Sequence, residues 1–262
     1  MFFLLNLNPI LQALIATIFT WSITAFGASL VYFFKKINKN VLDSMLGISA
    51  GVMIAASFWS LLSPAISMAN NLKMNTMFVV SIGFILGGLL LFIGDKIIDK
   101  LQHKKGITNN KRVVMLITSI TLHNIPEGLA VGVAFGSTLY GLDGATLMSA
   151  WTLALGIGIQ NFPEGTAVSV PLRREGFSRN KAFLFGQLSG IVEPMSGVIG
   201  AILVLKIRLI LPFLLAIAAG AMIYVVVEEL IPESQSNKSK DLMAMFTLVG
   251  FTIMMLLDVL LG

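Results

Sequence analysis

The sequence has 262 residues, of which 56% are hydrophobic and only 12% carry a charge, and its mean hydropathy is +0.89. Soluble domains contain about 25% charged residues, so this composition excludes an ordinary water-soluble globule and indicates an integral membrane protein. The absence of cysteine excludes a disulfide scaffold, an iron–sulfur protein and a thiolate zinc site.

Apolar runs separated by polar breaks predict eight membrane-spanning helices, and each run is close to the roughly 20 residues that a helix needs to cross a bilayer. No stretch outside them is long enough for a soluble domain, so we expect one all-α transmembrane domain over 1–262. The first run lacks a basic n-region and a cleavage pattern, which favours a retained helix over a signal peptide. The predicted spans are 9–34, 41–66, 77–98, 113–138, 145–170, 182–205, 209–231 and 242–261.

Basic residues test this topology, because lysine and arginine in short loops accumulate on the cytoplasmic side of a membrane. The loops after spans one, three, five and seven hold 15 of the 18 basic residues, and the other loops hold only Lys73, Lys206 and Arg208. Both termini are therefore predicted to be extracytoplasmic, in what we expect to be the plasma membrane. The net charge of +5 follows from topology and does not indicate nucleic-acid binding.

Spans four and five carry matching hexapeptides, HNIPEG at 123–128 and QNFPEG at 160–165. In each, the first residue and the glutamate are four apart and share one helix face. Each proline removes a backbone donor, so a kink is expected beside each polar edge. Pro194 predicts a similar kink in span six. Irregular backbone at membrane depth survives only where it faces protein or a water-lined cavity.

Three helices present acids at one depth. Counted from the cytoplasmic ends of their spans, His123 and Glu127 lie about 10 to 14 residues in, Gln160 and Glu164 about 6 to 10, and Glu193 about 12, at about 1.5 Å per residue. An ionised carboxylate at that depth costs several kcal/mol, so three of them need a shared partner, most simply a divalent cation.

Other polar residues leave alternatives open. Asn124 and Asn161 either hydrogen-bond across helices or join the metal site. Glu228 and Glu229, at the cytoplasmic end of span seven, form a candidate exit route. A serine strip in span two either lines an access route or allows close helix packing; it consists of Ser57, Ser60 and Ser63.

Together these motifs resemble the Zrt/Irt-like (ZIP) divalent metal transporters, and most closely their GufA-type branch, because span five begins its motif with Gln160. GQLSGIVEP in span six and YVVVEELIPE in span seven extend the resemblance over the whole chain. It implies that spans one to three and six to eight form inverted repeats around spans four and five, that metal moves toward the cytosol, and that the protein is a homodimer. The loop after span three has only His103 where several relatives are histidine-rich.

The resemblance also implies a binuclear site in which two carboxylates bridge the ions and span seven supplies the release route. The first ion would take His123, Glu127, Gln160 and Glu164. The second would take Asn124, Asn161 and Glu193 with the bridging Glu127 and Glu164. Glu228 and Glu229 match positions on the release route.

The leading hypothesis is therefore transport of a divalent cation, with zinc first and cadmium, iron(II) or manganese as alternatives, by alternating access around a fixed mid-membrane site. An intramembrane metalloenzyme is a rival, although no HExxH pattern is present and bridging glutamates leave no obvious base. A proton-coupled organic-solute carrier is a second rival, but the two hexapeptides contain no lysine or arginine to hold an organic anion.

Overall fold

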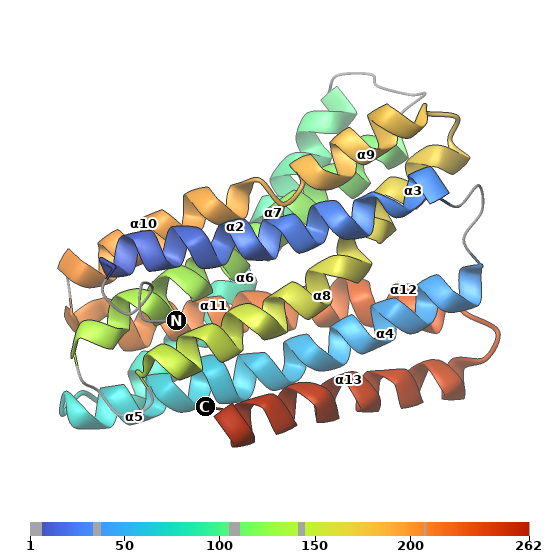
Figure 1. The fold of residues 1–262 in the computed structure, drawn as a ribbon. Coiled ribbons are helices and arrows are strands. Elements are labelled where there is room, and N and C mark those ends of the chain that lie inside the picture. Colours follow the sequence, from blue (N-terminus) through green and yellow to red (C-terminus); the bar gives the residue numbers. More distant parts are fainter. Residues whose placement is uncertain (1–6, 34–37, 105–110, 141–144, 207, 262) are drawn as a thin grey trace.

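The computed structural model describes residues 7–33, 38–104, 111–140, 145–206 and 208–261, and within these ranges the regular structure is entirely helical. Figure 1 shows the helices side by side in one elongated bundle. In chain order they are α2 (Pro9–Ala28), α3 (Leu30–Phe33), α4 (Lys39–Ala56), η1 (Ser57–Leu62), α5 (Ser63–Asn71), α6 (Thr76–Lys104), α7 (Lys111–Ser137), η2 (Thr138–Tyr140), α8 (Leu147–Arg174), α9 (Arg179–Leu188), α10 (Val192–Lys206), η3 (Arg208–Ile210), α11 (Leu211–Val225), η4 (Val226–Leu230), α12 (Ile231–Gln235) and α13 (Lys240–Leu261).

These elements form eight helical runs, each coinciding with one predicted span to within a few residues. In the described part of the chain, six runs are long and apolar enough to cross a membrane by length and composition alone. The two others are α7 and α8, which carry the polar hexapeptides and run through the bundle beside the rest (Figure 1). The prediction of an all-α membrane protein is confirmed.

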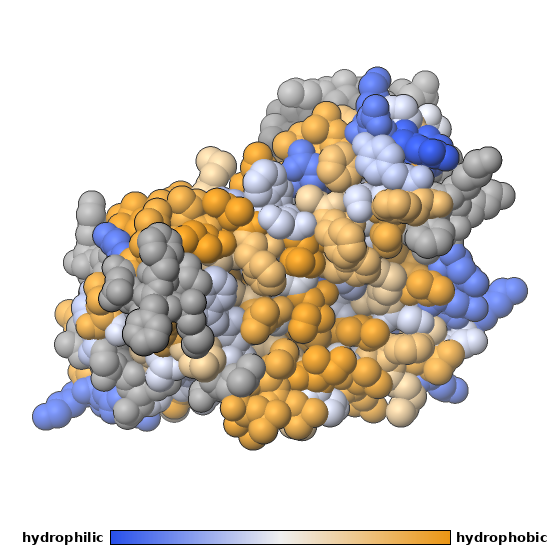
Figure 2. All heavy atoms as spheres, in the orientation of Figure 1, coloured by the Kyte–Doolittle hydropathy of each residue, from blue (hydrophilic) through white to orange (hydrophobic). Residues whose placement is uncertain are grey.

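The ends of the bundle differ in character from its middle. Helix α2 begins and α13 ends at the same end of the bundle (Figure 1), as an even number of crossings requires. Figure 2 shows hydrophobic residues over the middle of this face and hydrophilic residues gathered toward its two ends. Helices α6 and α13 are mostly exposed along their apolar windows, with 11% and 17% of residues buried. In a bilayer these surfaces face hydrocarbon.

Four helix pairs carry the most extensive packing: α7 with α10, α4 with α13, α6 with α11, and α2 with α8. Exchanging spans one with six, two with seven, three with eight and four with five maps these pairs onto one another, as inverted repeats require. Two of the pairs approach so closely that a Cβ at Gly51 would lie 1.9 Å from the Thr247 carbonyl, and one at Gly220 would lie 1.8 Å from the Phe84 carbonyl. Small residues of this kind let membrane helices pack backbone to backbone.

Spans two and seven share a π-helical turn at corresponding positions, η1 and η4. Each is closed by a bond to the carbonyl five residues back, from Ser63 N–H to Phe58 and from Ile231 N–H to Val226. A proline follows at once, Pro64 or Pro232, and its ring crowds the carbonyl four residues earlier, which the wider π turn accommodates. The shared irregularity is a second sign that the two halves are related.

Span six was predicted to be one helix kinked at Pro194, and the structure differs. It is broken at 189–191, between α9 and α10, where Gly190 N–H and Ile191 N–H bond back only three residues, to Gln187 and Leu188. Pro194 falls in the first turn of α10, where a missing donor costs little. The break places Glu193 at the start of a helix instead of in its middle.

Candidate metal site

The three glutamates predicted to share a depth are buried together. Glu127 on α7 and Glu193 on α10 are fully buried, and Glu164 on α8 is 4% exposed. Glu127 lies within electrostatic range of both other carboxylates, and Glu164 within range of Glu193. Buried carboxylates within range of one another repel when they are ionised.

The first residues of the span-five hexapeptide link it to span four and span two. Gln160 on α8, fully buried, donates a hydrogen bond from Nε2 to Oε1 of Glu127. Ser49 of α4 donates to the Gln160 carbonyl at 3.2 Å and to Glu164 Oε1 at 3.5 Å. Two hexapeptide carboxylates are thereby held by neutral donors from neighbouring helices.

Glu193 is the most heavily bonded of the three carboxylates. Asn161 donates from Nδ2 to both of its oxygens, at 2.9 Å each. Two threonines of α2 also donate: Thr20 to Oε2, and Thr24 to Oε1 at 3.4 Å. Because Glu193 lies in the first turn of α10, the positive end of the helix dipole further stabilises its negative charge.

Asn124 connects the span-four motif to the break in span six. It is fully buried and donates from Nδ2 to the Ser189 carbonyl at 2.9 Å. Residue 189 caps α9, so this carbonyl lies where the helix ends and needs a donor from elsewhere. The asparagine thus bonds across helices, which was one of the two roles predicted for it, while its Oδ1 remains available.

Five buried oxygen atoms on the motif side chains receive no hydrogen bond from any described residue. Buried polar atoms are almost always bonded, so a cluster of five in one region signals a ligand. All five are acceptors, and those on the carboxylates carry negative charge, so the missing partner is a cation or a strong donor. They are Asn124 Oδ1, Glu127 Oε2, Gln160 Oε1, Asn161 Oδ1 and Glu164 Oε2.

The glycine that ends each hexapeptide sets how closely the neighbouring helices approach. A Cβ at Gly128 would lie 2.4 Å from the Glu193 carbonyl and 2.7 Å from its Cα, so only glycine lets α10 bring Glu193 against α7. A Cβ at Gly165 would lie 2.0 Å from the Thr24 carbonyl, which holds α2 against α8. The glycines therefore assemble the site although they supply no ligand.

The remaining predicted ligands have different outcomes. His123 lies in α7, but its side chain is outside the described part of the structure. Glu229 in η4 is half-buried and within electrostatic range of Glu164, whereas Glu228 is exposed. Among the described side chains, no three His, Cys, Asp or Glu residues lie close enough to hold a metal by themselves. Among the described side chains, a metal bound at the motifs would thus need the amide oxygens as well.

Sequence reasoning missed the hydroxyl groups of spans one and two that hold the carboxylates. Thr17, Thr20 and Thr24 follow one another at spacings of three and four in α2, and all are buried, although Thr17 bonds only to its own helix backbone. That strip was the available signal. In the serine strip of span two, Ser60 donates to Asp258 on α13 at 2.8 Å, and Ser57 bonds back to Met53.

A family model described as ZIP Zinc transporter matches residues 102–258, which include both hexapeptides and Glu193. The chain belongs to the ZIP zinc transporter family. ZIP proteins are transporters, so the intramembrane enzyme considered from the sequence is excluded.

Relatives match nearly the whole chain. The human protein Zinc transporter ZIP11 is 38% identical over 97% of this chain and 98% of its own length. Zinc transporter ZIPB of Bordetella bronchiseptica is 34% identical over 91% of this chain and 78% of its own length. Zinc transporter GufA of Myxococcus xanthus is 31% identical over 95% and 98%. The resemblance to GufA-type members of the ZIP family is confirmed.

Proposed function

We propose that this protein carries zinc across a membrane toward the cytoplasm through the buried site between α7, α8 and α10. The observation that carries the proposal is the group of five unbonded acceptor oxygens beside three carboxylates that lie within range of one another. The names of the relatives as zinc transporters support zinc as the cargo. Cadmium, iron(II) and manganese have related ligand preferences and are further candidates.

Two ions fit the donor set in the arrangement that the family resemblance implies. The Gln160 and Glu127 side chains already touch, and each keeps one oxygen unbonded, so an ion can bind both without breaking the bond between them. His123 and Glu164 complete that ion's ligands in the proposal. Glu127 and Glu164 then bridge to a second ion.

The second ion would be held by the amide of Asn124, the amide of Asn161 and Glu193, together with the two bridging carboxylates. Both amides direct their NH₂ groups elsewhere, to the Ser189 carbonyl and to Glu193, which leaves Oδ1 of each as an acceptor. Zinc, iron(II) and manganese all accept oxygen ligands of this kind, while the lack of thiolates disfavours copper(I).

Transport toward the cytoplasm is what the family resemblance implies, and the placement of charge supports which end of the bundle is cytoplasmic. The predicted cytoplasmic loops carry most of the basic residues, and α12, which directly follows η4, lies toward the end of the bundle away from the termini (Figure 1). Glu229, within range of Glu164, is thus the proposed first step from the site toward the cytoplasm, and the exposed Glu228 the next. Each carboxylate offers a weaker, more hydrated site than the buried cluster, which lets the ion leave.

The same proposal includes the arrangement of the whole protein. It forms one transmembrane domain in the plasma membrane, with both termini extracytoplasmic and two copies associated as a homodimer. The 15-to-3 division of basic residues supports the orientation. Lipid bilayer and metal ions are its partners, and no nucleic acid is expected.

Glu127→Gln tests the proposal, because it removes the charge and keeps the size and the acceptor for Gln160. Purified protein in liposomes should lose nearly all zinc uptake with this variant. The matched control is Glu233→Gln, an identical change at an exposed glutamate of α12, and should transport as wild type does. Normal zinc flux by Glu127→Gln would remove the bridging role. Flux of an organic solute that needs no metal would support the carrier alternative.

A further inference from the structure

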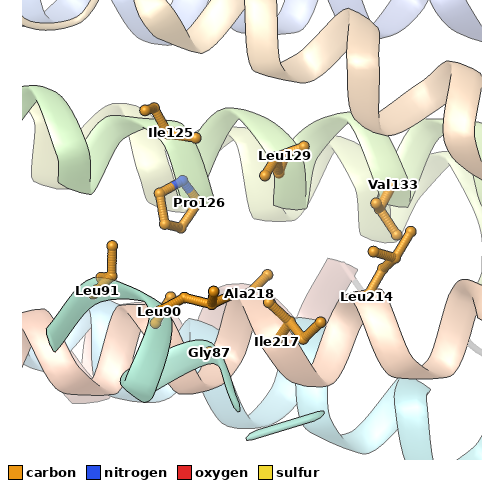
Figure 3. A pocket seen from close by; sticks show the side chains of 11 residues that line it. Gly87, Leu90, Leu91, Ile125, Pro126, Leu129, Val133, Leu214, Ile217 and Ala218 are labelled. Atoms are coloured by element: carbon orange, nitrogen blue, oxygen red, sulfur yellow. The ribbon is translucent and has the colours of Figure 1, made fainter. Parts of the chain in front are cut away.

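A separate cavity lies between α6, α7 and α11, and no residue of α8 or α10 lines it. Its volume is about 170 Å³. Figure 3 shows side chains of α7 facing those of α6 and α11 across it. The lining residues are Gly87, Leu90 and Leu91 of α6; Ile125, Pro126, Leu129 and Val133 of α7; and Leu214, Ile217, Ala218 and Ala221 of α11.

Every one of these residues is apolar, which decides what the cavity can hold. A buried water needs two to four polar partners, and an engineered apolar cavity of about 150 Å³ stays dry but binds benzene. The present cavity is similar in size and chemistry, so it suits a hydrocarbon group and not water or an ion.

The cavity lies where hydrocarbon is the surrounding solvent. Leu90 is 52% exposed, and α6 is largely uncovered along its membrane-crossing window. Helix α6 packs extensively on α11 but only lightly on α7, so the gap between α6 and α7 faces the bilayer core. The substance that contacts such a gap at this depth is the acyl chain of a lipid.

The depth of the cavity matches that of the metal site. Pro126 lines the cavity, and the next residue, Glu127, is fully buried on the Gln160 side of the same helix. Only α7 separates the two compartments. If the space beside Pro126 were empty, this face of α7 would lack packing contacts there. An acyl chain in van der Waals contact with the face would supply them.

We propose that this cavity is a binding site for one acyl chain of a membrane phospholipid, which enters between α6 and α7 and packs against Pro126 and Leu129. The inference concerns lipid binding and stands whether or not the protein transports zinc. The chain's outer part lies along Leu90, and its terminal part fills the space between Leu129 and Ala218.

The test uses the whole protein reconstituted in phosphatidylcholine that contains a small share of a phosphatidylcholine with a diazirine near the terminal methyl of one acyl chain. After illumination, labelled peptides are mapped. We expect labelling to concentrate on lining residues of α7 and α11. On the lipid-exposed face of α13, labels should be fewer and spread evenly.

Two substitutions fill the cavity from different walls, Leu90→Trp and Leu214→Trp. Each should reduce labelling of the α7 lining roughly tenfold, which corresponds to losing the burial of about two methylene groups. The control is Leu89→Trp, the same change at a neighbouring residue that is 45% exposed and does not line the cavity. It should leave the labelling unchanged.

The outcomes separate the proposal from its rivals. Labelling of α7 at the same level as α13, or labelling that persists in both filled variants with folded protein, overturns it. So does disulfide formation between two copies of a Leu90→Cys variant, because a second protein copy would then occupy the gap. Folding of each variant is checked by its elution as a single species and by its circular dichroism.

Discussion

Gly128→Ala should disrupt the metal site without removing any ligand. The added Cβ would lie 2.4 Å from the Glu193 carbonyl, and contacts below 3.0 Å do not occur, so α7 and α10 must separate locally by at least 0.6 Å. Ser196 Oγ, at 2.1 Å, can rotate only by giving up its bond to the Val192 carbonyl. Overpacking of this kind costs about 1–3 kcal/mol.

The functional effect should exceed the loss of stability. Glu193 moves with its backbone, and a misplacement of about 1 Å at a site of this kind can reduce activity by about 100-fold. Since the shift here is smaller, we expect a reduction of at least roughly tenfold in zinc uptake at subsaturating zinc. Most of it should come from a higher apparent Km, because the ligands are present but displaced.

Gly88→Ala is the matched control. It makes the same change in the middle of a membrane helix, but its Cβ would meet nothing closer than 3.7 Å, at the Gly220 carbonyl. Replacing a helical glycine in open space stabilises the helix by about 0.5–1 kcal/mol. The assay is zinc uptake by proteoliposomes over a zinc series, with equal protein and with thermal unfolding in detergent measured in parallel. Equal uptake by both variants would refute the claim that Gly128 sets the position of Glu193.

Three further predictions concern the ligands. Glu164→Ala should nearly abolish zinc uptake at normal expression, because it leaves the other two carboxylates without a bridging partner. Uptake above roughly a tenth of wild type would contradict this, since a tenfold loss corresponds to only about one pK unit of binding free energy. Zinc uptake at fixed membrane potential should fall as pH is lowered from about 7 to 5, because carboxylate and imidazole ligands must be deprotonated to bind metal, and a steady rise with acidity would indicate proton-coupled influx instead. Gln160→His should raise the ratio of zinc to manganese in competitive uptake, because imidazole nitrogen suits zinc better than an amide oxygen does; an unchanged ratio would mean that Gln160 does not contact the transported ion.

The fold was predictable because the bilayer simplifies the problem. All eight helical runs lie where apolar length and loop charge place them, since a backbone in hydrocarbon has to bond within its own helix. The break at 189–191 was not predictable from periodicity. Its signal in the sequence is Gly190, but Pro194, four residues later, attracted the prediction. The π turns before Pro64 and Pro232 were equally invisible, because both spans consist mostly of apolar residues and show little periodicity for one inserted residue to interrupt.

The candidate site was predictable to the level of residue type. Shared spacing in the two hexapeptides identified the acids and amides, and the structure places Gln160 against Glu127 and Asn161 against Glu193. Position along a helix does not show which neighbour supplies a hydroxyl, so Thr20 and Ser49 required the packed structure. Hydroxyl residues are common in membrane helices and bond to their own backbone when nothing else is near, which makes them weak signals in sequence.

The site contains carboxylates and neutral hydrogen-bond donors, and the hydrogen bonds show what each kind of side chain does. Glu193 has both oxygens occupied by neutral donors, whereas Glu127 and Glu164 each keep one oxygen unbonded. Neutral donors stabilise a buried carboxylate without cancelling its charge, so the negative potential is retained for an incoming cation. A lysine or arginine in the same place would neutralise the site permanently and compete with the metal. A carrier has to release its cargo, and the carboxylates of this site need no metal to hold them in place, because Thr20, Ser49 and Asn161 already donate hydrogen bonds to them.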